Sequence, residues 1–212
     1  MSGLPPTPKQ CQAFLNNKSP QAYEELVDSL LSSDAHAEHL TREWLDNARY
    51  ADTNGYQYDK ARTMWPWRDW VLQAFQDNKT FDEFVTEQLA GDLLPGSTQQ
   101  QKIATGFLRN HAYSTEGGII DEEYRVHYVN DLTSTVGTVF MGLTMDCTRC
   151  HNHKYDPLTA KDYYSLYSFF NNTVGKGRDT PAIHYSTSDK TLVKKLTNQL
   201  IDDKELLLSK LD

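Results

Sequence analysis

Long apolar runs are missing from this sequence of 212 residues. The longest, around residues 136–141, is far short of the roughly 20 residues that a membrane-spanning helix needs. We therefore expect no transmembrane segment in this chain. Runs of Lys and Arg are missing as well, and the formal net charge is -8. Because phosphate binding needs a basic face, we also expect no nucleic-acid partner.

Cysteine is scarce, with three in the chain. That number is too small for the disulfide framework of a small secreted domain. Cys147 and Cys150 belong to one local motif, while Cys11 stands alone in an amphipathic helical stretch. For Cys11 the pattern favours a buried and inert thiol. With 38% hydrophobic and 24% charged residues, the composition is that of a folded globular protein.

The ends of the chain bear on domain organisation. Its start has neither the basic nor the apolar region of a secretory signal, and its end lies inside a charged helical pattern over residues 192–211. We therefore expect residues 1–212 to be a single mainly helical domain from a larger protein. Residues 190–212 would be the start of a charged helical extension.

Helix signals recur along the chain, whereas no convincing pair of alternating strands is present. Thr7-Pro8 and Ser19-Pro20 each pair an N-cap oxygen with proline at the first helical position. Thr80 and Glu83 have the spacing of a capping box. The longer helices are expected at residues 35–51, 65–77, 80–89, 97–109, 120–144 and 159–170. The fold class is therefore all-α, an irregular multi-helix domain with long loops, in which a long central helix leads directly into the cysteine motif.

The motif itself is Cys147-Thr148-Arg149-Cys150-His151. Two thiols separated by two residues and followed by His are typical of covalent haem attachment, in which the thiols bind the vinyl groups and the imidazole ligates the iron. The spacing predicts a haem c, with His151 as the proximal ligand. Since such haem is attached outside the cytoplasm, we expect a bacterial parent protein that is periplasmic or otherwise exported.

Two other readings of the motif stay open. Zinc accepts sulfur and nitrogen ligands, so Cys147, Cys150, His151 and His153 could share a zinc ion, although no second pair lies at finger spacing. A dithiol redox pair would usually open a helix beside a parallel sheet, and no such sheet is expected here.

The second axial position of a haem has several candidates. His111 lies on a loop that the fold could bring over the haem, as distal ligand or distal acid/base, or it could simply be a surface loop histidine. His127 lies too far back along a straight helix. Met141 and Met145 both continue an apolar helical face, so we expect them to pack in the core rather than to bind iron. His153 could bond a propionate or bind a second metal ion.

Basic side chains near the motif could bind the haem propionates. Arg125, Arg149 and Lys154 are the candidates, because arginine can bond a carboxylate through two parallel donors. Ordinary surface pairing explains them equally well, since Arg125 follows Asp121 by four residues. Several carboxylates could build a calcium site or an acid/base pair if some of them converge. These are Asp52, Asp59, Glu116, Glu122, Glu123 and Asp131.

Four longer segments carry a family resemblance: residues 44–52 (WLDNARYAD), 65–70 (WPWRDW), 87–95 (EQLAGDLLP) and 150–157 (CHNHKYDP). They resemble the planctomycete-type cytochrome-C-like domain of unknown function, over nearly the whole chain. The resemblance implies a place in large exported proteins, after a separate cytochrome-like module and before another uncharacterised domain. It supplies no known reaction.

Three hypotheses of function follow. The first is a haem c domain that passes electrons within the parent protein, with its other domains and redox proteins as partners. The second is a haem- or metal-dependent enzyme or accessory domain that acts on an extracellular substrate such as polysaccharide, using His111, His153 and nearby carboxylates. The aromatic loop at residues 56–67 motivates it. The third is a structural domain in which Cys147 and Cys150 tie a turn.

Overall fold

A computed structural model describes residues 1–172 of the chain. These residues form helices and loops, with one isolated antiparallel bridge between Thr53 and Ala61 and no strand, so the all-α prediction is confirmed. The α-helices are α1 (Pro8–Asn16), α2 (Ala22–Leu31), α3 (Asp34–Asn47), α4 (Trp65–Gln76), α5 (Phe81–Ala90), α6 (Gln99–Ala104), α7 (Asp121–Met141) and α8 (Ala160–Phe170). Three short 3-10 helices are η1 (Gly91–Leu93), η2 (Thr105–Arg109) and η3 (Asp146–Arg149).

Two further predictions concern a C-terminal extension and membrane-spanning segments. The expected charged extension at residues 190–212 lies outside the described residues. Within residues 1–172, no helix combines the length and the apolar content that crossing a membrane would require.

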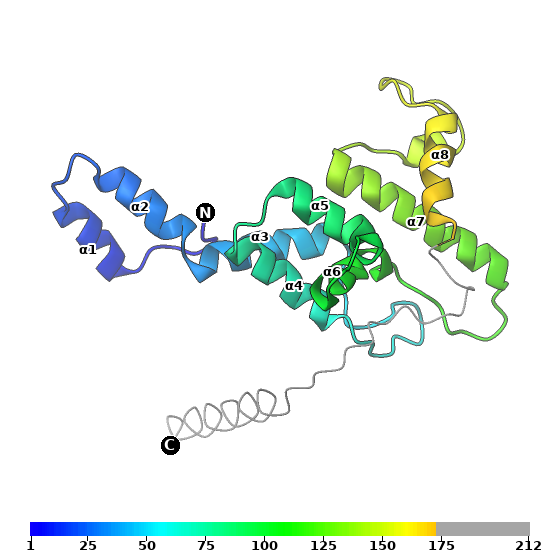
Figure 1. Cartoon of the computed structure of the whole chain (residues 1–212), viewed down its shortest axis with the longest axis horizontal. Helices are drawn as coiled ribbons and strands as arrows, with labels where there is room; N and C mark the ends of the chain where they lie inside the picture. The colour runs from blue at the N-terminus through cyan, green and yellow to red at the C-terminus, as the bar shows by residue number, and fades with distance from the viewer. Residues whose placement is uncertain (173–212) are drawn as a thin grey trace, which may run out of the picture.

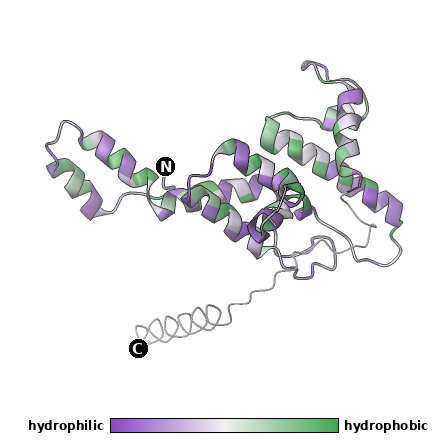
Figure 2. Ribbon diagram, viewed as in Figure 1, coloured by the Kyte–Doolittle hydropathy of each residue, from purple (hydrophilic) through white to green (hydrophobic). Residues whose placement is uncertain are grey.

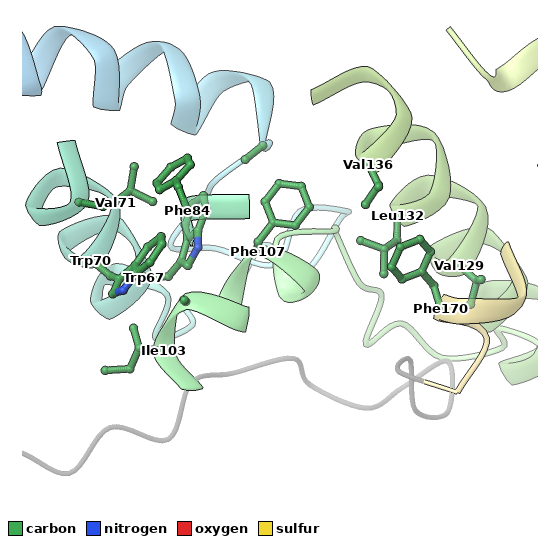
Figure 3. Packing of buried hydrophobic residues seen from close by; sticks show 13 residues of the cluster. Trp67, Trp70, Val71, Phe84, Ile103, Phe107, Val129, Leu132, Val136 and Phe170 are labelled. Carbon is green, nitrogen blue, oxygen red and sulfur yellow. The ribbon is translucent and has the colours of Figure 1, made fainter. Parts of the chain in front are cut away.

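The core joins two groups of buried side chains, both visible in Figure 3. One group comes from α4, α5 and α6, with Trp67 and Phe84 among its largest members. The other comes from α7 and α8, where Leu132 lies close to Phe170. Phe107 of η2 lies between the two groups in this view. Burying a side chain of this size stabilises a fold by about 1.5–3 kcal/mol, so these contacts hold α3–α6 and α7–α8 in one body.

The first two helices stand apart from this core. In Figure 1 α1 and α2 lie side by side and project away from the other helices, and neither contains a buried residue. Figure 2 shows apolar and polar residues mixed along both. Cys11 of α1 is exposed, so the prediction of a buried thiol was wrong. Helix α1 faces α2 and the N-terminal residues across an open hollow, and all of its residues are exposed.

The helix starts match the sequence signals in part. Thr7 caps α1, as Thr7-Pro8 predicts, and it also forms a full capping box with Gln10. After Ser19-Pro20, helix α2 begins later than expected, because the Ser19 hydroxyl accepts from the backbone N–H of Gln21 in a turn. Thr80 precedes α5 without any side-chain cap, so the predicted capping box with Glu83 is absent. Its hydroxyl is bonded to the Asp82 carboxylate instead.

The long helix α7 ends before the cysteine motif rather than running directly into it. Gly142 terminates it with φ of 65°, a left-handed conformation that glycine adopts readily. The backbone N–H of Leu143 then donates to the Gly137 carbonyl at 3.0 Å. The chain therefore folds back on the last turns of α7, and this reversal places the motif beside the helix.

Candidate functional site

The cysteine motif forms a short turn on the surface. Cys147 and Cys150 are free and exposed, and His151 is exposed as well. The backbone N–H groups of Cys150 and His151 both donate to the Cys147 carbonyl at 3.3 Å. This local bonding places the three side chains on one compact turn, open to solvent.

Neighbouring residues hold this turn against α7 and α8. Thr148 is fully buried and its hydroxyl donates to the Met145 carbonyl. The hydroxyl of Ser134, on α7, donates to the Asp146 carboxylate. The Tyr164 hydroxyl, on α8, donates to the Arg149 carbonyl at 2.9 Å. The turn is therefore anchored from behind by both helices, which leaves the thiols free to react.

The geometry of His151 suits metal ligation. Its Nδ1 lies 2.8 Å from the carbonyl oxygen of Asn152. Because a carbonyl can only accept, Nδ1 must carry the hydrogen in this contact, and the lone pair then resides on Nε2. A carbonyl that fixes the tautomer in this way is typical of histidines that bind metals. The turn therefore fits haem c in three respects: two accessible thiols, their spacing and an oriented imidazole.

His153 has a structural role in the loop that follows. Its Nδ1 accepts the backbone N–H of Asp156 at 2.9 Å and lies 3.2 Å from the Asp156 carboxylate. Its own backbone N–H donates to the Leu158 carbonyl at 2.8 Å. These contacts close the turn at Asp156-Pro157. The proposed binding of a propionate or a second metal by His153 would have to use Nε2.

His111 is buried, with 6% of its surface exposed, so it is not a surface histidine, although its loop also contains exposed residues such as Ala112 and Thr115. Its ring stacks on Tyr128 with centroids 4.8 Å apart, and its Nδ1 lies 3.0 Å from the Ala112 carbonyl. Burial lowers the pKa of His111 from 6.5 to about 4, so the imidazole is neutral at pH 7. Within residues 1–172, these two contacts join His111 to α7 and to its own loop, and not to the cysteine motif. Its role as a distal ligand stays a prediction.

The three basic residues considered for the haem propionates have different partners. Arg125 forms a bidentate pair with Glu122 and donates to the Asn171 side chain at 2.8 Å, so it joins α7 to the end of α8. Lys154 lies over the ring of Tyr155, with Nζ 5.2 Å from the centroid. Arg149 is exposed and lines a cleft beside the motif. Of the three, Arg125 is therefore the most fully engaged by protein groups.

Another cleft, called here the asparagine cleft, lies between the loop at residues 51–62, the loop at residues 110–113 and the first half of α7. Its volume is about 660 Å³, within the usual range for small-molecule pockets. Asn54 and Asn110 both line it, and they are only 1% and 3% exposed. Neither polar atom of either amide has a hydrogen-bond partner. Each buried group left unpaired costs about 1–3 kcal/mol, so burying these two amides lowers the stability of the fold.

Arg62 holds the two loops of this cleft together. Its guanidinium donates to the carbonyl oxygens of His111 at 2.9 Å and Asn110 at 3.1 Å, and also to those of Ala51 and Arg109 at 3.2 Å. Burial lowers the pKa of Arg62. The Arg62 guanidinium therefore donates to backbone carbonyls of both loops, and these hydrogen bonds fix the walls of the cleft.

A second cleft continues from the first along α7. Its volume is about 400 Å³, and both clefts are lined by Arg49, His127 and Asp131. Arg149 and Asp146 of the motif turn also line the second cleft. The two hollows therefore extend along one face of α7, from the buried asparagines to the back of the cysteine motif.

The carboxylates singled out from the sequence serve mainly as local partners. Asp59 accepts the backbone N–H of Gly55, and Glu116 accepts that of Gln57. Asp131 pairs with Arg49. Within residues 1–172 no three His, Cys, Asp or Glu side chains lie together so as to hold a metal ion, so the additional metal expected as a possibility gains no support here.

A comparison with protein-family models finds one whose description reads PSCyt2, protein of unknown function (DUF1549), and it matches residues 1–174. The chain belongs to the PSCyt2 family. The match covers every described helix of this PSCyt2 domain and agrees with the cytochrome-C-like family of unknown function that its sequence resembles. No curated protein and no solved structure matches the chain. The family description assigns this PSCyt2 domain no reaction.

The sequence alone does not predict that Asn54 and Asn110 line one cleft. Asn54-Gly55 is a turn signal and Asn110 directly precedes His111, but nothing local to either pair indicates that they meet. They are joined in the fold by the backbone N–H of Tyr113, which donates to the Asn54 carbonyl at 3.0 Å. A contact between loops more than fifty residues apart leaves no periodic signal in the sequence.

Proposed function

We propose that this domain carries a haem c bound to Cys147 and Cys150, with Nε2 of His151 as the proximal iron ligand, and that it passes electrons within a larger protein. The observation that carries the proposal is the exposed turn on which both thiols and a correctly oriented imidazole lie together. When bound, haem supplies an iron that exchanges one electron at a time. The residues of the chain attach it, orient it and anchor its turn to α7 and α8.

The exposure of the motif determines how such a haem would be used. Cys147, Cys150 and His151 are all exposed, so the haem would extend from the surface of this domain. A haem edge close to solvent favours electron exchange with a second redox domain or a separate redox protein, because little polypeptide separates the two centres. We therefore propose such partners. Since haem is joined to thiols outside the cytoplasm, we also propose an exported, periplasmic parent protein in bacteria.

For the second axial position of the iron we propose His111. His111 shares with His151 an Nδ1 bonded to a neighbouring carbonyl, which leaves its Nε2 lone pair available. To ligate a haem on the motif, the imidazole would have to leave its stack on Tyr128. A low-spin, six-coordinate spectrum that His111→Ala converts to high spin would support this role. An unchanged spectrum in a variant that folds would exclude it.

The proposal is tested by producing the chain in an exporting bacterial host with haem-attachment machinery. Mass spectrometry of the intact protein should show the added mass of one haem, and a visible spectrum should show the absorption bands of a c-type haem. Cys147→Ser/Cys150→Ser should abolish both signals. Cys11→Ser is the matched control, because Cys11 is also free and exposed but lies outside the motif. Colourless, correctly folded protein from the haem-attaching host would exclude the haem proposal.

A further inference from the structure

One peptide group beside the cysteine motif makes two hydrogen bonds that point in opposite directions. It joins Asn152 to His153. Its carbonyl accepts from Nδ1 of His151 at 2.8 Å, and its N–H donates to the Leu158 carbonyl at 2.8 Å. Because a peptide group is planar and rigid, the bond to Leu158 fixes the direction in which the carbonyl faces His151. The orientation of the imidazole therefore depends on the loop that follows the motif.

The side chain of Asn152 holds the same residue from another direction. Its Oδ1 accepts the backbone N–H of Ala160 at 3.0 Å, and Ala160 is the first residue of α8. The first N–H groups of a helix have no acceptor within that helix, so they are open to a bond of this kind. Helix α8 is itself anchored in the core through Phe170. Asn152 is thus bonded to a fixed helix by its side chain and to His151 by its carbonyl.

The loop at residues 153–158 is closed on itself by His153. Its Nδ1 accepts the backbone N–H of Asp156 at 2.9 Å, and the N–H of Leu158 donates to the Asp156 carbonyl at 2.7 Å. The side chain of His153 is 13% exposed, so the protein shields these bonds from most of the solvent. The Leu158 carbonyl is therefore held within reach of the His153 N–H. Both supports, the loop and α8, act on one carbonyl.

We infer that Asn152 is a positioning residue for His151. Held by α8 and by the loop at residues 153–158, its carbonyl keeps the ring hydrogen of His151 on Nδ1 and leaves the lone pair on Nε2. Such a hydrogen bond also makes Nε2 a stronger electron donor to a metal. The inference rests on the proposed function only where iron is named as that metal, because the tautomer is a property of the chain without haem.

The tautomer of His151 is measured on the whole 212-residue chain, made without haem, labelled with ¹⁵N and kept reduced. Long-range ¹H–¹⁵N NMR spectra at alkaline pH, where free imidazole is neutral, show which ring nitrogen carries the hydrogen. In the parent chain Nδ1 should carry it almost entirely. Asn152→Ala loses the bond to Ala160, so its spectra should show a mixture of both tautomers. A parent chain with the hydrogen on Nε2, or an Asn152→Ala variant that keeps it on Nδ1, would overturn the inference.

Two further variants separate the positioning of His151 from the capping of α8. Asn152→Asp keeps an oxygen for the N–H of Ala160, so it should restore the single tautomer. Thr159→Ala is the matched control, because the Thr159 hydroxyl accepts the backbone N–H of Asp162 at 3.2 Å and also caps α8. It should lower the midpoint of thermal unfolding and leave the ring hydrogen on Nδ1. Mixed tautomers in Thr159→Ala, or in Asn152→Asp, would contradict the role assigned to the Asn152 side chain.

Haem-loaded protein distinguishes a failure of this inference from a failure of the proposed function. The reduction potential of Asn152→Ala should lie above that of the parent chain, because a weaker donor at Nε2 stabilises iron(III) less. Normal haem attachment with equal potentials in the two proteins would overturn the inference and leave the proposed function intact. A chain that attaches no haem would overturn the proposed function, and the spectra of the haem-free chain would then decide the inference alone.

Discussion

Met145 occupies the space that a side chain at position 137 would need. A Cβ atom added at Gly137 would lie 2.5 Å from the Met145 sulfur and 2.7 Å from its Cγ. Met145 is 3% exposed and directly precedes the motif turn, while Gly137 lies near the end of α7. The missing side chain therefore lets the cysteine motif pack against the helix that leads to it.

Gly137→Ala should lower the free energy of unfolding by about 1 kcal/mol. Alanine gains about 1 kcal/mol in a helix interior relative to glycine, but overpacking a tight contact costs about 1–3 kcal/mol. The change is measured by urea unfolding. In a Met145→Ala background the same substitution should be neutral or stabilising, because the opposing sulfur is gone. An equal loss in both backgrounds would show that Met145 is not the obstacle.

Gln88 joins α3 to α5 from inside the core. It is fully buried, accepts the indole N–H of Trp44 at 3.0 Å and donates to the Phe84 carbonyl at 3.1 Å. Gln88→Met keeps the shape but leaves the Trp44 donor unpaired, so we expect a loss of about 1–3 kcal/mol in the free energy of unfolding. Gln73→Met is the control, because Gln73 is exposed on α4 and should change stability by about 0.5 kcal/mol at most.

The Arg62 clamp predicts that lysine cannot replace arginine at this position. Arg62→Lys keeps the charge but loses the planar fork that reaches the carbonyls of Asn110 and His111. We expect a loss of about 3 kcal/mol in the free energy of unfolding, since bonds to charged donors contribute about 1.5–3 kcal/mol each. Limited proteolysis should then cut within residues 51–62 or 110–118 first. Unchanged stability and cleavage would mean that the clamp does not hold these loops.

The helices could be predicted from the sequence because their signals are local. Thr7-Pro8 identified the start of α1, and apolar spacing at 3.6 residues per turn, together with Trp65-Pro66, identified α4 to within one residue at each end. The expected helix at residues 97–109 divides into α6 and the 3-10 turn η2, at Thr105. Periodicity does not distinguish these two helix types over so few residues.

Burial was harder to predict than helix type. An amphipathic pattern shows that a helix has an apolar face, but it does not show whether another element covers that face. Met145 is buried as expected, whereas Met141 is 53% exposed and its assignment to the core was wrong. Of the four tryptophans, Trp67 and Trp70 are buried, but Trp65 at the start of α4 is 40% exposed.

In the candidate site, too, the residues related by local spacing were predictable and those placed by long-range contacts were not. Cys147, Cys150 and His151 were identified from spacing alone, because covalent haem chemistry needs them as near neighbours. The environment of His111 depends on α7 and on the Arg62 clamp, and both contacts come from distant parts of the chain. Long-range contacts of this kind decide whether a loop histidine is exposed or buried.

His111 should make the stability of the domain depend on pH. Its pKa is lowered from 6.5 to about 4 by burial, so between these values the unfolded chain binds a proton that the folded chain does not. Its contribution is therefore fully present above pH 6.5, falls as the pH drops toward 4 and stays constant below that. The total loss is roughly 3 kcal/mol at most.

The contribution of His111 is isolated with His111→Gln, which cannot titrate. Thermal unfolding of both proteins from pH 7 to pH 4 should show a stability that falls more steeply for the parent chain than for the variant, since other groups titrate equally in both. The ring protons of His111 should report the lowered pKa directly in an NMR titration. Parallel curves, or a ring that titrates near pH 6.5 in the folded protein, would mean that the imidazole is accessible to water and that its stack on Tyr128 opens readily.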